Sequence, residues 1–138
     1  MNRILGTDPK GWIVLNAIQT PDGTILHSKN LYDYKTHKDK NGKEYMVDGG
    51  MSYLRRNAHN DYKELSKYYT DLTHEEVIDI LEWGNAYDKD MKRLPKVNFI
   101  KIKDMTTDHI QAILDGNFCH NPMYLKVFKD ELERRSNA

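Results

Sequence analysis

Hydrophobic and polar positions follow a strand-like alternation in the first part of the chain. The β-rich segments 11–18 and 24–28 flank the turn residues Pro21-Asp22-Gly23 and predict a first hairpin. Residues 31–48, with Asn41-Gly42 as their turn, predict a second hairpin. Residues 1–10 end at Asp8-Pro9 and predict a loose lead into the first strand.

The second half of the chain changes to a helical spacing of apolar residues. Capping patterns predict helix starts at Asp61, Thr73, Thr106 or Thr107, and Asn121-Pro122. The first helix carries apolar residues up to Tyr69, while Gly84 and Gly116 are expected to end the second and third. Residues 97–102 predict a last strand or extended segment.

Strands first and helices afterwards predict an α+β fold. We expect a small antiparallel sheet of two hairpins within residues 11–50, packed against about four helices within residues 51–138. A length of 138 residues fits one domain with one hydrophobic core.

Charge and cysteine content narrow the class of protein. The 21 basic and 21 acidic residues balance, so the sequence gives no strong nucleic-acid signal. The single cysteine, Cys119, excludes an intrachain disulfide and a thiolate metal cluster. No run of about 20 apolar residues suggests a membrane span, and no signal peptide is recognisable. We expect a soluble, intracellular protein without a membrane partner.

A two-glycine corner, Gly49-Gly50, is the first candidate site. Glycines permit unusual backbone angles and close approach, and a following helical turn would expose unpaired amides to an anion. Arginine side chains bind carboxylates or phosphates as planar forks. The predicted ligand-binding residues are Asp48, Gly49, Gly50, Tyr53, Arg55 and Arg56. The alternative is a structural corner in which Asp48 caps the turn and both arginines pair with acidic residues.

Histidines and aspartates form the second candidate. Asp33 and His37 share one face of a predicted strand, although about 13 Å of rise separates them. Asp104, Asp108 and His109 gather at a predicted helix start, where capping and the helix dipole also explain carboxylates. The catalytic interpretation is a small hydrolase or nuclease that uses His37, Asp33, His109 and Asp108. No complete catalytic motif, metal frame or nucleotide fingerprint is present, which favours a non-enzymatic protein without cofactor or metal.

Several runs together resemble a family of small, uncharacterised tailed-bacteriophage proteins. They lie within residues 20–135 and include Val47-Asp48-Gly49-Gly50-x-x-Tyr53-x-Arg55-Arg56 and Lys103-Asp104-Met105-x-Thr107-Asp108-His109-Ile110. Members of the family carry a His-Arg-His-type run where this chain has Asn30-Leu31-Tyr32, which argues against a shared metal site. The resemblance implies a phage accessory protein in the cytoplasm of the infected host, and it implies no particular activity.

These observations lead to one hypothesis and two alternatives. The hypothesis is a protein that binds an anionic small molecule, such as a nucleotide signal, or a host protein, for anti-defence or host takeover. The alternatives are the small hydrolase or nuclease and an oligomeric structural or protein-interaction protein. Nine tyrosines suit stacking on a base as well as partner contacts.

Overall fold

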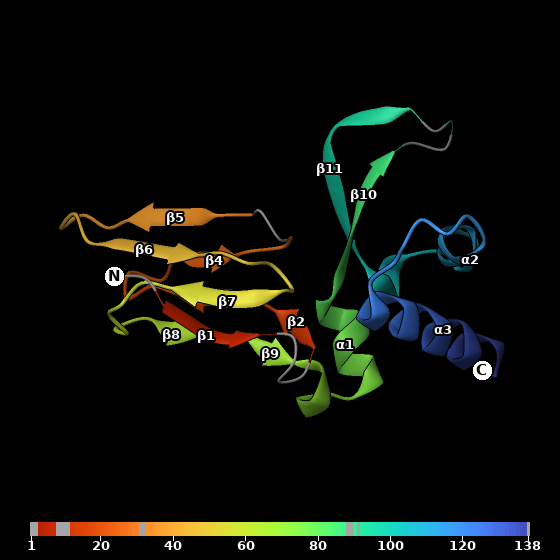
Figure 1. The fold of residues 1–138 in the computed structure, drawn as a ribbon, viewed down its shortest axis with the longest axis horizontal. Helices are drawn as coiled ribbons and strands as arrows, with labels where there is room; N and C mark the ends of the chain where they lie inside the picture. Colours follow the sequence, from red (N-terminus) through yellow and green to blue (C-terminus); the bar gives the residue numbers. More distant parts are fainter. Residues whose placement is uncertain (1–2, 8–11, 31–32, 88–89, 91, 138) are drawn as a thin grey trace. The chain divides into compact units, whose positions relative to one another are not determined.

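The computed structural model describes residues 3–7, 12–30, 33–87, 90 and 92–137, with backbone only for 3–7 (Figure 1). The chain divides into two compact units, Met1–Thr73 and His74–Ala138. Each combines short antiparallel pairings with its own buried side chains, and α-helices occur in the second. The α+β class is confirmed, while a single domain over 1–138 stays a prediction.

Short antiparallel strands build the first unit (Figure 1). Strand β1 pairs with β7, β2 with β9, and β5 with β6, while β3 lies between β4 and β8. The elements are β1 (Arg3–Thr7), β2 (Ile13–Leu15), β3 (Ala17–Gln19), β4 (Ile25–His27), β5 (Lys35–Lys38), β6 (Glu44–Val47), β7 (Tyr53–Arg56), β8 (Lys63–Glu64), β9 (Lys67–Tyr68) and the 3-10 helix η2 (Tyr69–Asp71).

Both predicted hairpins form in part: in the first, β3 pairs with β4, whereas β2, from the same predicted strand 11–18, pairs with β9. Ile18 lies opposite Leu26 in the β3–β4 hairpin, and Thr36 lies opposite Met46 in the β5–β6 hairpin. Turn residues between the strands set both registers, as expected from loop chemistry. The hairpins belong to different sheets, however, so the prediction of one sheet made of both is only roughly matched. Leu31 and Tyr32, at the predicted start of the second hairpin, lie outside the described residues.

Three local predictions in this unit are wrong. The stretch 3–7, expected in a loose lead, forms strand β1 against β7. Strand β7 also replaces the helical turn expected after Gly50. The helix expected from Asp61 is replaced by β8, β9 and η2, because residues 63–64 pair with β3 and residues 67–68 with β2. Pairing between distant strands therefore overrides the local helix signal.

A cluster of four buried side chains forms part of the first unit's core, with Tyr62 packed against it. Its members are Ile18, Leu26, Tyr45 and Val47. They come from β3, β4 and β6, so the cluster joins the two hairpins through apolar contact.

The second unit contains a long hairpin and three α-helices within the described residues (Figure 1). Its elements are α1 (His74–Ile80), β10 (Glu82–Tyr87), β11 (Arg93–Lys101), the 3-10 helix η3 (Ile102–Asp104), α2 (Thr107–Asp115) and α3 (Pro122–Ser136). The strand predicted over 97–102 is the end of β11 up to Lys101, and Ile102 begins η3. The second half of the chain is thus less helical than predicted, and three α-helices replace the expected four or so.

Helices α2 and α3 begin as their caps predict. The Thr106 side chain accepts a hydrogen bond from the His109 amide, and Gly116 follows the last turn of α2. The Asn121 side chain accepts from the amides of Met123 and Tyr124, with a proline at the first helical position. Helix α1, in contrast, ends at Ile80 and not at the predicted Gly84, because the chain continues directly into β10.

A buried carboxylate ties α3 to α1. Glu131 is fully buried and accepts hydrogen bonds from Arg134 and Arg135 of its own helix, at 2.7–2.8 Å. His74, the first residue of α1, lies 2.9 Å from the same carboxylate. Burial alone would raise the pKa of Glu131, but the hydrogen bonds from Arg134, His74 and Arg135 lower it to about 2.

Apolar side chains from α1, η3, α2 and α3 are also buried in this unit, among them Val77, Ile102, Ile110 and Val127. Cys119, in the loop between α2 and α3, is also buried, and burial raises the pKa of its thiol. None of the helices described here is both long enough and apolar enough to cross a membrane.

Candidate functional site

The two-glycine corner connects β6 to β7, and both glycines have positive φ, 102° at Gly49 and 52° at Gly50. A Cβ atom at Gly49 would lie 2.1 Å from the carbonyl oxygen of Tyr53, and one at Gly50 would lie 2.2 Å from the carbonyl carbon of Asn30. The close approach predicted for this corner is therefore made by the chain's own backbone.

The corner amides donate within the protein. Gly49 N donates to Oδ1 of Asp48 and Gly50 N to the Ser28 hydroxyl, each at 2.9 Å. The side-chain amide nitrogen of Asn16, Nδ2, donates to the backbone carbonyl oxygens of Asp48, Gly50 and Tyr53 at 2.9–3.1 Å. Asn16 is fully buried, so its hydrogen bonds hold the backbone of the corner in place from the protein interior.

The two adjacent arginines have different surroundings. Arg56 is fully buried and donates to both carboxylate oxygens of Glu64, at 3.0 and 2.6 Å, and to the Ser66 hydroxyl. The side chain of Arg55 is 43% exposed and donates to Asp48 at 3.3 Å. Both guanidinium groups thus have acidic partners, as in the structural alternative. Ligand binding at these six residues stays a prediction, and a ligand there must displace existing contacts.

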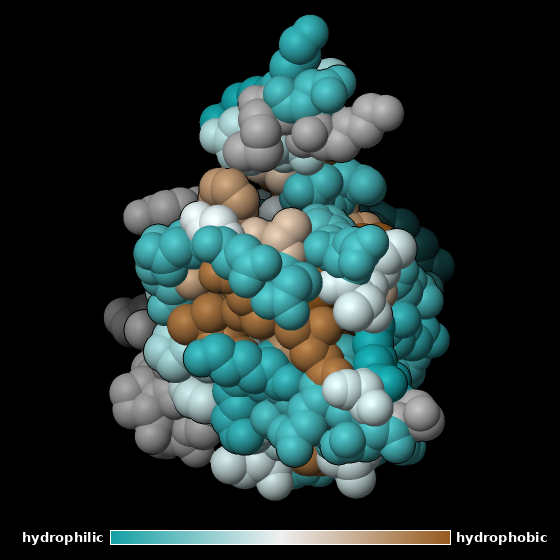
Figure 2. Space-filling view, turned by 90° about the vertical axis from the view of Figure 1, so that its right-hand side faces the viewer, coloured by the Kyte–Doolittle hydropathy of each residue, from teal (hydrophilic) through white to brown (hydrophobic). Residues whose placement is uncertain are grey.

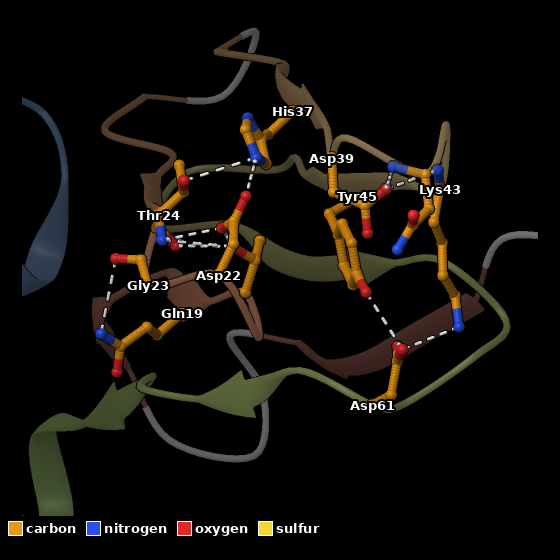
Figure 3. Close-up of polar contacts among 11 residues, drawn as sticks. Gln19, Asp22, Gly23, Thr24, His37, Asp39, Lys43, Tyr45 and Asp61 are labelled. Carbon is orange, nitrogen blue, oxygen red and sulfur yellow. Dashed lines mark hydrogen bonds and ion pairs between the residues drawn. The ribbon is translucent and has the colours of Figure 1, made fainter.

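His37 pairs with a different aspartate from the one that its spacing suggested (Figure 3). Its Nε2 lies 2.8 Å from Oδ2 of Asp22, in the turn of the first hairpin, and 3.4 Å from the Thr24 hydroxyl. Hydrogen bonds from Thr20, then from His37 and Thr24, hold the pKa of Asp22 well below its usual range. Asp33 instead accepts from the Lys29 amide and pairs with Lys35.

The contacts of His37 link the two hairpins and do not form a relay. Both Asp22 and Thr24 approach the same ring nitrogen, whereas a nucleophile–base–acid arrangement uses both nitrogens of the imidazole. A second polar cluster in Figure 3 surrounds Asp61, which binds Lys43 at 2.7 Å and the Tyr45 hydroxyl at 3.0 Å. The hydrogen bond from Lys43 lowers the pKa of Asp61 to about 2, although burial opposes it.

A pocket of about 760 Å³ lies in the second unit between β10 and α2. This volume falls within the roughly 300–1,000 Å³ of small-ligand sites. Figure 2 shows hydrophobic residues gathered in the middle of the face that it draws, with hydrophilic residues around them. The pocket is lined by Trp83, Gly84, Asn85, Ala86 and Tyr87 of β10, Asp108, His109, Ala112 and Ile113 of α2, and Phe118 from the following loop.

Exposed aromatic residues distinguish this pocket from the core. Phe118 is 57% exposed and Tyr87 is 45% exposed. Trp83 is half-buried and packs edge-on against Tyr124 and Phe128, with ring centroids 5.7 and 5.5 Å apart. The Tyr124 hydroxyl donates to the Glu82 carbonyl at 2.6 Å. Helix α3 therefore holds the base of β10, and with it one wall of the pocket, in place.

Two of the predicted catalytic residues, Asp108 and His109, line this pocket. Asp108 is exposed in the first turn of α2, and no cation pairs with it among the residues that the structure describes. Asp104 lies in η3 and is not part of the lining. Asp33 and His37 belong to the first unit. Within the described part of the chain, no group of three or more His, Cys, Asp and Glu residues could hold a metal ion.

Sequence reasoning missed the pocket itself. The available signal was the series Trp83-Gly84-Asn85-Ala86-Tyr87, in which small residues separate aromatic ones. No protein-family model, curated protein or solved structure matches this chain.

Proposed function

We propose that the protein acts by binding, and that the pocket between β10 and α2 is where it holds an apolar segment of a partner protein. The observation that carries this proposal is an apolar hollow with partly exposed aromatic walls, Trp83, Tyr87 and Phe118. Aromatic side chains offer a large contact area at low entropic cost and are enriched in protein interfaces.

A protein partner accounts for these features better than an anionic ligand does. The described lining residues include Asp108 and His109 but no lysine or arginine, so they offer no fixed positive charge to a phosphate. Combined with the resemblance to phage proteins, the proposal is an accessory protein that binds a host protein in the infected cell's cytoplasm, for anti-defence or host takeover.

The test compares two charge-matched variants on one helix. Ala112→Lys puts a long charged side chain into the pocket, whereas Gln111→Lys places the same side chain on an exposed position of α2 outside the lining. The tagged full chain is used to capture proteins from a bacterial host, and a captured protein is purified and titrated by calorimetry. We expect Ala112→Lys to abolish this binding and Gln111→Lys to keep it. Equal binding by both variants would contradict the proposal.

A further inference from the structure

We infer that the partner segment binds as an additional β-strand on β10, with a basic residue beside Asp108. This inference rests on the proposed function and specifies how the same pocket is used. Its starting observation is that five consecutive residues of β10, Trp83 to Tyr87, line one pocket.

Five consecutive lining residues locate the pocket relative to the strand. Side chains of successive strand residues point to opposite faces of a sheet. A pocket on one face would contact every second residue, such as Gly84 and Ala86. Five consecutive lining residues are what a pocket along the edge of β10 would contact, because backbone and both sets of side chains are reached there, and we therefore assign the pocket to that edge.

That edge has no neighbouring strand within the described residues. β10 and β11 form a two-stranded sheet, with Trp83 opposite Ile100 and Gly84 opposite Phe99. β11 therefore occupies one edge of β10, and our assignment puts the pocket, which α2 also lines, at the other edge. An unpaired edge presents a row of backbone donors and acceptors to an extended peptide.

The lining residues also suit a peptide backbone at this edge. Ala86 on the strand and Ala112 on the facing helix have small side chains and limit the bulk on the two sides of the pocket. At Gly84 the space that a Cβ would take is already filled by Val97 and Phe99 of β11, 3.0 and 3.1 Å away. Trp83, Tyr87 and Phe118 then bracket the peptide's apolar side chains. A peptide with alternating apolar and polar residues would direct one set toward these rings.

The charge of the pocket lining determines which residue of the peptide is favoured next to its apolar positions. Among the described lining residues, Asp108 is the one acidic side chain, and no lysine or arginine accompanies it. An extended segment with lysine or arginine next to its apolar positions complements this rim. A segment with glutamate there would face like charge.

The experiment selects binding peptides from a random 12-residue library on the full-length chain and remakes the strongest one in three forms. Two forms carry N-methyl groups on alternate backbone amides, in the odd or the even positions. The third replaces its basic residues with glutamate. Affinities are measured by calorimetry with the wild-type chain and with Ala112→Lys, Gln111→Lys and Asp108→Asn.

Strand addition predicts that N-methylation in one set of positions weakens binding about tenfold or more, whereas the other set has little effect, since only alternate amides face β10. The glutamate form should bind about two- to fivefold more weakly, and Asp108→Asn should remove that difference. A different result would overturn strand addition and leave the proposed function standing. In that result, a peptide binds the wild-type chain, does not bind Ala112→Lys, and keeps its affinity with either set of amides methylated.

Two further outcomes would also overturn the inference. One is a selection that yields no peptide sensitive to Ala112→Lys. The other is self-association of the wild-type chain in light scattering that Ala112→Lys abolishes, because the occupant would then be a second copy of this chain.

Discussion

Oε1 of Glu131 lies 2.9 Å from Nε2 of His74, although 57 positions separate the two residues. Both belong to the second unit, where this contact joins α3 to α1. A carboxylate that is fully buried and surrounded by three basic side chains is costly to remove, because its partners keep their positive charge or polarity without it.

We expect Glu131→Gln to lower the free energy of unfolding of the second unit by roughly 3 kcal/mol, because one partner of a buried ionic group is lost. Trp83 fluorescence during urea unfolding, in a Trp12→Phe background, reports this unit selectively. Asp130→Asn is the control, since its pair with Lys126 is an exposed contact one turn apart. That variant should cost less than about 0.5 kcal/mol. Equal losses in both variants would contradict a special role for Glu131.

The same carboxylate makes the second unit sensitive to acid. Its pKa is about 2 in the folded chain, against a usual value of 4.5. The unfolded chain therefore takes up this proton at a higher pH than the folded chain does. The stabilisation is complete above about pH 4.5 and is lost as the pH falls toward 2. Unfolding free energies measured across this range should fall more steeply for wild type than for Glu131→Gln, and parallel curves would refute the assignment.

The two neighbouring arginines should respond differently to truncation. Arg56→Ala is expected to destabilise the first unit by roughly 3 kcal/mol, because it removes a large, fully buried side chain, leaves a cavity and loses the bidentate pair with the partly exposed Glu64. Arg55→Ala should cost less than about 1 kcal/mol, since its pair with Asp48 is long and partly exposed. Chemical unfolding followed by Trp12 fluorescence, in a Trp83→Phe background, measures both. A larger effect of Arg55→Ala would be incompatible with this structure.

Alanine substitutions at Gly50 and Gly42 separate two effects: the overlap of an added Cβ with neighbouring atoms, and the strain of a positive φ. Both have positive φ, at 52° and 81°, but an added Cβ at Gly42 meets no atom within 4 Å. We expect Gly42→Ala to cost about 1 kcal/mol, from strain alone. Gly50→Ala should cost at least about 2 kcal/mol more, because the new methyl group overlaps the backbone of Asn30. Thermal melting of the two variants compares them directly.

The hypothesis of an anionic ligand at the corner makes its own prediction. A nucleotide there must compete with Asp48, which already accepts from Gly49 and Arg55. Asp48→Asn should then bind more tightly than wild type, and Arg55→Ala should lose binding. A panel of nucleotides and cyclic dinucleotides, read by thermal melting, tests this. Melting temperatures unchanged by every ligand in all three proteins would exclude the hypothesis.

The sequence was sufficient to predict those turns and helix starts that depend only on residues close by in the chain. The hairpin turns at Pro21-Asp22-Gly23 and Asn41-Gly42, and the caps Thr106 and Asn121, lie within a few residues of what they determine. The side chain of Asp61 shows why a local signal also fails. It has the form of a helix cap, but its carboxylate binds Lys43 and Tyr45 from β6 and its preceding turn, which no local pattern encodes.

The candidate site was predictable only in part, for the same reason. Asp108 and His109 were singled out from their position at a helix start, but the pocket also needs β10, whose strand conformation depends on pairing with β11. Gly84 illustrates the ambiguity. A glycine after an apolar helical stretch predicts a helix end, whereas here it sits within a strand, 15 positions from its partner Phe99.

Cys119 gives the second unit a built-in chemical reporter. Cys119 is 5% exposed and carries the one sulfhydryl in the sequence, so we expect a thiol-reactive reagent to label the protein mainly when the loop between α2 and α3 opens. The labelling rate therefore counts opening events beside the pocket without any engineered dye site. A bound partner that stabilises α2 would slow the labelling rate. The reactivity of Cys119 would then report whether the pocket is occupied.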